Sequence, residues 1–221
     1  MRVIIRLIGV LLIAAAITMF FWQDIRAYFT NSVNEKIIKS YEKNEDHVKV
    51  NEFEKWITKT EPEKLKLKDN MLGYLKIKTA KINEPLYKGP ATLEALKNGV
   101  VLVDKDEKLT EQNVAIAGHR VEGAGIRFNY LDRAKVGDKV ELLSRSGTNV
   151  YEISKIYNVK PTEVGVLDEE PGKPQELTLI TCEDYNPDTL LFEKRMIVKA
   201  KIIEKNGVKV KKNNSEIKNV A

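Results

Sequence analysis

The amino-acid sequence predicts a mostly β domain, a closed barrel or a sandwich, that follows a membrane-spanning helix and a helical stalk. Three observations predict it. An apolar run of about 20 residues opens the chain. A charged segment without glycine follows, and from about residue 65 short β-rich runs alternate with turn residues. The 221 residues fit one domain of roughly 150 residues with appendages.

The first element is a membrane anchor over residues 1–22. Residues 3–22 read VIIRLIGVLLIAAAITMFFW, with Arg6 as their only charged residue, and about 20 helical residues span a ~30 Å hydrocarbon core. The run ends in Phe20, Phe21 and Trp22, as at a membrane interface, and no small-x-small cleavage site follows it. We therefore favour a retained anchor over a cleaved signal peptide. Arg2 and Arg6 predict a cytoplasmic N-terminus and an extracellular remainder, in a single-pass cell-membrane protein.

The second element, residues 23–64, is predicted to be an extracytoplasmic helical stalk. Its apolar residues recur at irregular helical spacing among charged ones, and it holds no glycine and a single proline, Pro62. His47 lies in the charged sequence EDHVK, so we interpret it as a surface histidine.

The third element, residues 65–206, carries the β-rich runs, and residues 207–221 form a basic polar tail. Breaks with glycine, asparagine, aspartate or proline separate the runs, and a short helix is predicted over 91–99. The net charge is +5, but the basic residues are interspersed with acidic ones, so no nucleic-acid-binding stripe is predicted. The runs cover residues 71–77, 99–103, 113–118, 138–144, 149–159, 176–182 and 195–203.

Cys182 is the only cysteine, so the chain cannot form an internal disulfide. It ends the apolar run ELTLIT and precedes the polar sequence EDYNPD, which predicts a strand end at the rim of a rigid scaffold. A lone thiol outside the cytoplasm is unusual and marks a candidate nucleophile.

A cysteine nucleophile needs a partner that favours its thiolate. His119 follows the β-run NVAIAG and precedes Cys182 by 63 residues, so only the fold can bring the two together. Arg195 opens the next run, 13 residues after Cys182, and a guanidinium can donate hydrogen bonds to an oxyanion or a substrate carbonyl. Surface or structural roles stay open for each residue taken alone.

Together these residues resemble the class A, housekeeping sortases. The sequence TLITC, 178–182, fits their TLxTC signature, AGH, 117–119, fits their histidine segment, and EKR fits their arginine at Arg195. The likeness extends from about 71 to 203, and VKPTEVGVLDE, 159–169, resembles the loop before their cysteine strand. The resemblance implies an eight-stranded β-barrel with short helices and a cysteine transpeptidase.

In such an enzyme Cys182 would attack the Thr–Gly bond of an LPXTG-type sorting signal and form a thioacyl intermediate. An amine on a lipid II-type peptidoglycan precursor would then take the surface protein. His119 would act as general acid and base, and Arg195 would hold the substrate and the oxyanion. The resemblance places the groove for the sorting signal at Ala91, Ala117, Val164, Val166, Leu167, Ile180 and Thr181.

The chemistry needs no cofactor, but the resemblance implies Ca²⁺ as an activator. Its carboxylate ligands would be Asp104, Glu107, Glu111 and Glu169, and Lys105 inside this cluster departs from a purely acidic pattern. The expected partners are surface proteins with the sorting signal, the precursor amine, the membrane and a second copy in a weak homodimer. The alternatives are a cysteine protease that only hydrolyses the signal, a pilus-type sortase, and a non-enzymatic anchored barrel.

Overall fold

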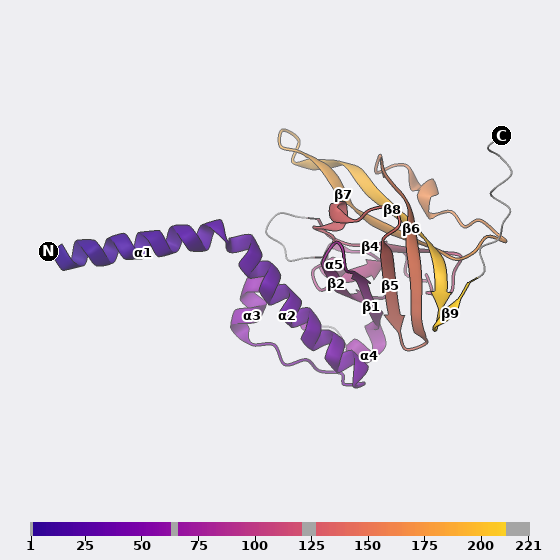
Figure 1. Cartoon of the computed structure of the whole chain (residues 1–221), viewed down its shortest axis with the longest axis horizontal. Helices are drawn as coiled ribbons and strands as arrows, with labels where there is room; N and C mark the ends of the chain where they lie inside the picture. The colour runs from indigo at the N-terminus through magenta and orange to yellow at the C-terminus, as the bar shows by residue number, and fades with distance from the viewer. Residues whose placement is uncertain (1, 63–65, 121–126, 211–221) are drawn as a thin grey trace.

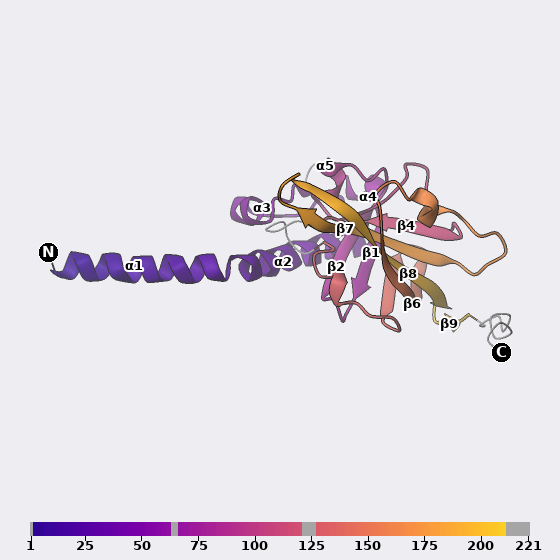
Figure 2. The ribbon, with the colours of Figure 1, turned by 90° about the horizontal axis from the view of Figure 1, so that it is seen from above.

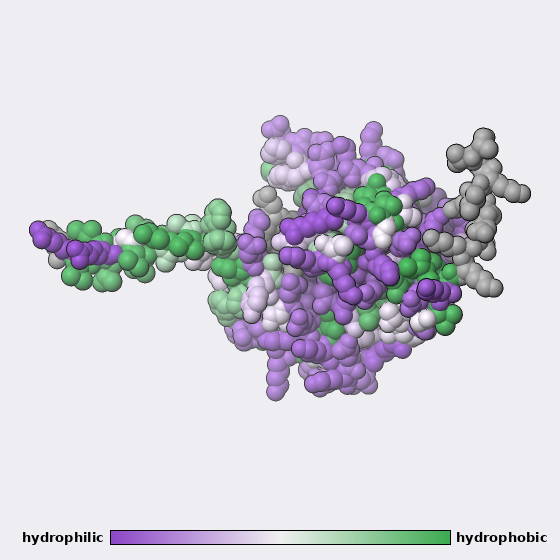
Figure 3. Space-filling model, viewed as in Figure 1, coloured by the Kyte–Doolittle hydropathy of each residue, from purple (hydrophilic) through white to green (hydrophobic). Residues whose placement is uncertain are grey.

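The computed structural model describes residues 2–62, 66–120 and 127–210. Helix α1 (Arg2–Phe20) extends away from the rest of the molecule, and none of its residues is buried (Figures 1 and 2). By length and composition it can cross a membrane, which is consistent with the predicted anchor. Figure 3 shows its hydrophobic side chains exposed along most of its length.

Eight strands that follow the N-terminal helices along the chain close into a barrel, as predicted. They follow one another around the barrel in the order β6-β5-β1-β2-β3-β4-β7-β8, and pairing of β8 with β6 closes it. The pairs β2–β3 and β4–β7 are parallel and the others antiparallel. The strands are β1 (Met71–Ile77), β2 (Ile82–Tyr87), β3 (Val100–Leu102), β4 (Asn113–Ala117), β5 (Lys139–Ser144), β6 (Gly147–Val159), β7 (Glu176–Asn186) and β8 (Leu191–Lys205), with the two-residue β9 (Val208–Lys209) beside β8.

Alternation along the strands builds the barrel interior. Leu177 and Leu179 of β7 and Val198 and Ala200 of β8 are fully buried in one hydrophobic cluster, which continues through Leu75 of β1. The residues between them therefore lie on the outer face of the barrel. Short helices fill the connections: α4 (Leu67–Asn70), α5 (Leu93–Leu96), and the 3₁₀ turns η2 (Leu131–Arg133) and η3 (Val164–Leu167).

Two boundaries differ from the sequence prediction. Strand β7 continues to Asn186 and β8 begins at Leu191, so Cys182 and Arg195 lie within their strands and not at strand ends. Pairing of Tyr185 with Phe192 supports this two-stranded extension, because the centroids of the two aromatic rings lie 5.2 Å apart on it. The apolar pattern that predicted the strand ends at Cys182, because Glu183 and Asp184 are charged. The two strands nevertheless continue to pair beyond this point, Glu183 with Lys194 and Asn186 with Leu191.

Strand β2 is missing from the predicted runs. Its sequence INEPLY places Glu84 and Pro85 in the middle of the strand, which breaks the apolar alternation. Glu84 is nevertheless completely buried and forms an ion pair with Arg127, so a buried polar pair stands where the pattern requires a hydrophobic residue.

Helices α2 (Trp22–Glu42) and α3 (Glu52–Thr58) occupy the segment predicted as a stalk. The second half of α2 packs on β1 and β2: the buried Tyr41 donates a 2.8 Å hydrogen bond to the Leu72 carbonyl, and the Tyr74 hydroxyl donates to Glu42 at 2.6 Å. The residues of this second cluster are Val33, Ile37, Ile38, Tyr41, Val48, Val50, Leu67, Met71, Tyr74 and Tyr87. The N-terminal helices are thus part of the folded body, while the segment boundaries at 22, 64 and 206 stay predictions.

Candidate active site

Cys182 and Arg195 are direct cross-strand partners. The antiparallel register of β7 and β8 pairs Cys182 with Arg195 and Ile180 with Ile197. Side chains of directly opposed residues lie on the same face of a sheet, so the thiol and the guanidinium share the outer face of the barrel. Both residues are half-buried. The Arg195 guanidinium donates to the Lys194 carbonyl at 3.1 Å and, more weakly, to that of Phe192 at 3.4 Å.

His119 reaches the same place from the other side of β7. Strand β4 runs parallel to β7 with Ala117 beside Ile180, and the ladder continues as the Gly118 amide donates to the Ile180 carbonyl at 3.0 Å. The Thr181 hydroxyl donates back to the Gly118 carbonyl at 2.8 Å. The two segments therefore run side by side as far as Gly118 and Thr181, so the predicted nucleophile and arginine lie on β7 and β8 and the predicted base lies two residues after the end of the adjacent strand β4.

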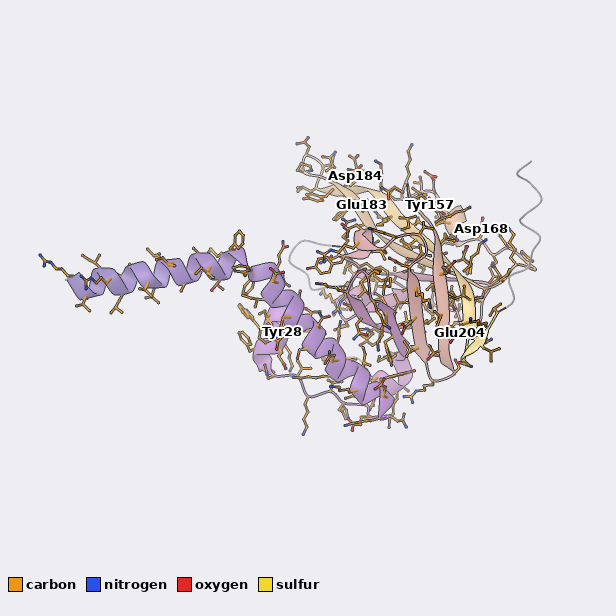
Figure 4. All side chains as sticks on the ribbon, in the orientation of Figure 1. Tyr28, Tyr157, Asp168, Glu183, Asp184 and Glu204 are labelled. Carbon is orange, nitrogen blue, oxygen red and sulfur yellow. The ribbon has the colours of Figure 1, made fainter. Side chains whose placement is uncertain are left out.

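An ion pair locks this register one residue further on. Arg120 follows His119, Glu183 follows Cys182, and their side chains form an ion pair; Arg120 also binds Asp132 at 3.2 Å. Figure 4 shows Glu183 and Asp184 on the part of β7 that extends past the site. The sequence reasoning missed this pair. Its signal was present, because Arg120 and Glu183 are separated by the same 63 residues as His119 and Cys182.

The backbone around His119 is held from two directions. Its carbonyl accepts a 3.0 Å hydrogen bond from the Phe128 amide, and the Phe128 ring lies so close to Gly118 that a Cβ there would come within 2.5 Å of it. Burial lowers the pKa of His119, the positive charges of Arg127 and Lys97 lower it further, and the backbone carbonyl of Leu93 opposes them. The imidazole is therefore biased toward its neutral form.

Five of the seven residues predicted to line the substrate groove lie on the outer face of β4 and β7 or in η3. Ala117 and Ile180 are neighbours on the outer face of β4 and β7. Val164, Val166 and Leu167 lie in η3, which is fastened over this face. The Val166 carbonyl accepts hydrogen bonds from Asn113 of β4 at 3.1 Å and from Lys199 of β8 at 2.8 Å.

The other two predicted groove residues have their own contacts. Ala91 is half-buried, and its amide donates to the Val103 carbonyl at 3.2 Å. Thr181 is buried, with its hydroxyl on the Gly118 carbonyl.

The four predicted calcium ligands, Asp104, Glu107, Glu111 and Glu169, line one surface pocket of about 390 Å³. Backbone amides engage three of them. Glu107 accepts from Asp104 at 3.1 Å and from Ala115, Glu111 accepts from Lys108 at 3.0 Å, and Glu169 accepts from Gln112 at 3.0 Å. Over residues 2–62, 66–120 and 127–210, no three acidic, histidine or cysteine side chains converge closely enough to hold a metal ion. Burial raises the pKa of Glu107. The pocket thus gathers the carboxylates without the coordination geometry that Ca²⁺ needs.

Comparison with known proteins decides the family. The family model of the sortase domain matches residues 75–203. The chain belongs to the sortase family. This sortase is 40% identical over 190 residues to sortase A of Staphylococcus aureus, a match that covers 86% of the chain and 91% of that protein. It is 35% identical over 141 residues to sortase A of Streptococcus agalactiae, covering 62% of the chain and 54% of that relative.

Solved sortase structures share the fold. Sortase A of Listeria monocytogenes aligns with a TM-score of 0.54 and 24% identity over 61% of this chain and 88% of that one. Sortase C of Streptococcus pneumoniae aligns with a TM-score of 0.56 and 21% identity over 83% and 89%. The predicted family and barrel are therefore confirmed, and this sortase is a cysteine transpeptidase of the sortase A type. The roles of the individual site residues stay predictions.

Proposed function

We propose that this sortase cleaves an LPXTG-type sorting signal between threonine and glycine and joins the threonine carbonyl to an amine of a lipid II-type precursor. The observation that carries the proposal is the register of three strands, which places Cys182 opposite Arg195 and beside the strand that leads into His119. A lone thiol whose neighbouring chain segments carry a histidine and an arginine suits acyl transfer through a thioester.

In the proposed first half-reaction, neutral His119 accepts the Cys182 proton and the sulfur adds to the threonine carbonyl carbon. Arg195 donates hydrogen bonds to the resulting oxyanion, for which its guanidinium must leave the carbonyls of its own strand. The C–N bond then breaks, and His119 returns the proton to the departing glycine amine. The products are a thioester on Cys182 and a free peptide that begins with glycine.

In the second half-reaction the acceptor amine adds to the thioester carbonyl, and His119 takes the proton that the amine loses. The C–S bond breaks, a new amide remains, and the proton returns to Cys182. Water in place of the amine would give hydrolysis. A site for the apolar part of the signal on the outer face of β4 and β7 is supported by two observations: Ala117 and Ile180 are neighbours there, and Asn113 and Lys199 hold the Val166 carbonyl of η3 over the same face.

For the membrane topology we propose that α1 spans the cell membrane with a cytoplasmic N-terminus, so that the barrel faces the cell wall. Arg2 and Arg6 at one end of the helix support this direction. A weak homodimer stays a prediction, which sedimentation in detergent at graded concentration would check.

The deciding experiment combines an LPXTG-type peptide with the full chain, with and without an amine acceptor. We expect ligated product only when the amine is present and none from Cys182→Ala. Arg195→Ala should lower kcat/KM by about 10²–10³-fold, because one oxyanion donor is lost. Wild-type enzyme that releases only hydrolysed peptide at saturating amine would favour the protease alternative. Full activity of Cys182→Ala would eliminate a thioacyl route altogether.

We further propose that Ca²⁺ binds in the pocket beside Glu107 and activates the enzyme. Binding would require Glu111 and Glu169 to leave the Lys108 and Gln112 amides and converge. Because Glu169 belongs to the connection that contains η3, this movement would act on the predicted groove. Titration calorimetry with CaCl₂ should show saturable heat for wild type and much less for Glu111→Gln. Absence of heat with wild type would contradict the proposal.

A further inference from the structure

Two large aromatic side chains lie exposed and in contact with each other on α3. Phe53 is 56% exposed and Trp56 57% exposed, whereas Glu54, Ile57 and Thr58 on the other side of the same helix are buried. The side of α3 that faces the protein therefore carries the polar Glu54 and Thr58 as well as Ile57. Its aromatic residues lie on the side that faces outward. This departure from the usual arrangement makes the outer side of α3 a candidate contact surface.

Helix α3 is fixed firmly in this orientation. The Asn51 side chain and Glu54 form a reciprocal capping box at its start, and Lys36 of α2 forms an ion pair with the buried Glu54 at 2.5 Å. At its end, Arg26 of α2 donates a 3.0 Å hydrogen bond to the Ile57 carbonyl. The exposure of Phe53 and Trp56 thus follows from a well-anchored helix and not from a loose one.

The exposed rings continue into the end of the membrane helix. Trp56 contacts Trp22 at 6.1 Å and Phe53 at 6.0 Å, and Phe53 contacts Phe29 at 5.4 Å, measured between ring centroids. Trp22 follows the last residue of α1 by two positions. We call Trp22, Phe29, Phe53 and Trp56 the aromatic surface.

Both ribbon views place this surface where the folded body meets the membrane helix. In Figures 1 and 2, α3 and the start of α2 form the end of the body that faces α1. In Figure 3 hydrophobic side chains continue from α1 onto this end. A membrane plane drawn across the end of α1 would therefore meet α3 before any strand of the barrel.

We propose that the aromatic surface lies in the headgroup region of the membrane that α1 crosses and docks the catalytic domain on the bilayer. The inference rests on the anchor in the proposed function and adds a second, peripheral contact. Tryptophan and phenylalanine rings favour this interfacial layer. The Lys59 ammonium lies 5.9 Å from the centre of the Trp56 ring, where it can reach lipid phosphates while its stem covers the ring.

Docking at two points restricts the orientation of the barrel. A single helical anchor would let the domain tilt. Contact through both α1 and α3 would hold the outer face of the barrel, which carries Cys182, in one orientation relative to the membrane. The acceptor precursor is itself lipid-linked in the proposed function, so a fixed orientation of the barrel would favour the approach of the precursor to Cys182.

The test uses the full chain reconstituted in vesicles of phosphatidylcholine and phosphatidylglycerol whose acyl chains carry bromine near the headgroup. Trp22→Phe leaves Trp56 as the only tryptophan, and Trp56→Phe leaves only Trp22. Removing both and adding Val208→Trp gives the matched control, because Val208 is 70% exposed at the end of the barrel away from α1 (Figure 1). We expect brominated lipid to quench Trp56 and Trp22 and to leave the emission of the Val208→Trp control unchanged.

Three results would overturn the inference and can be told apart. Quenching of Trp22 alone would leave the anchor intact and place α3 in water. Quenching of neither tryptophan would reject the anchor together with the docking. Blue-shifted Trp56 emission without quenching, accompanied by crosslinking between copies, would assign the aromatic surface to a second protein molecule.

Discussion

At the scale of single residues, the parallel pairing of β4 with β7 builds the site. It holds equivalent positions 63 residues apart, so the segment that leads into His119 runs beside the part of β7 that leads into Cys182, and Arg120 forms an ion pair with Glu183. The antiparallel partner β8 then supplies Arg195. The β4–β7 and β7–β8 registers together thus bring the segments that carry the three predicted catalytic residues next to one another.

The protonation of His119 provides a prediction at this scale. We expect its pKa to lie below the usual value of about 6.5, because burial and the charge of Arg127 disfavour the imidazolium. The ring is then neutral at pH 7 and becomes charged only as the pH falls through the lowered pKa. The acid limb of kcat/KM should accordingly lie below pH 6.5 if neutral His119 is the base.

Titration of the His119 ring resonances by NMR checks this directly. Lys97→Gln should raise the pKa of His119 slightly, since a positive charge that disfavours the imidazolium is removed. A pKa for His119 above the usual value of about 6.5 would contradict this expectation.

At the scale of elements, a buried polar cluster joins the N-terminal helices to the barrel. Arg127 is 4% exposed and binds Glu84 of β2, Asn34 of α2 at 3.1 Å and the Lys97 carbonyl after α5 at 2.7 Å. Its neighbour Phe128 holds the His119 backbone. The packing of α2 and the placement of the histidine segment therefore depend on one guanidinium.

Loss of Arg127 should destabilise the whole fold. Arg127→Met leaves the carboxylate of Glu84 buried without its cation, and we expect the free energy of unfolding to fall by about 3–5 kcal/mol. Urea unfolding of the full chain in detergent measures it. The double variant with Glu84→Gln should recover part of the loss, because the buried charge is gone. Strictly additive effects of the two substitutions would show that the pair is not coupled.

The same cluster marks the limit of prediction from sequence. Cys182 and His119 could be found because each is the only residue of its type in the barrel, and a motif joined them to Arg195. Strand β2 could not, since its central Glu84 is buried through an ion pair with Arg127, which lies 43 residues away. Asn34 is 93 residues from Arg127, so no local pattern signals their contact.

At the scale of the whole molecule, one continuous body links the membrane to the chemistry. Helix α1 leads into α2, α2 packs on β1 and β2, and the barrel carries the site on its outer face. The exposed aromatic residues at the α1 end and the candidate site on β7 and β8 occupy different parts of this body, so membrane contact and substrate binding can occur together.

The central claim is that Cys182 carries the threonine acyl group between the two half-reactions. Intact-protein mass spectrometry after brief mixing with an LPXTG-type peptide, without acceptor amine, tests it most directly. We predict an adduct equal to the peptide through its threonine, located on Cys182, released by hydroxylamine and absent from Cys182→Ala. Cleavage by the wild-type chain with no such adduct, or an adduct on any other residue, would contradict this claim.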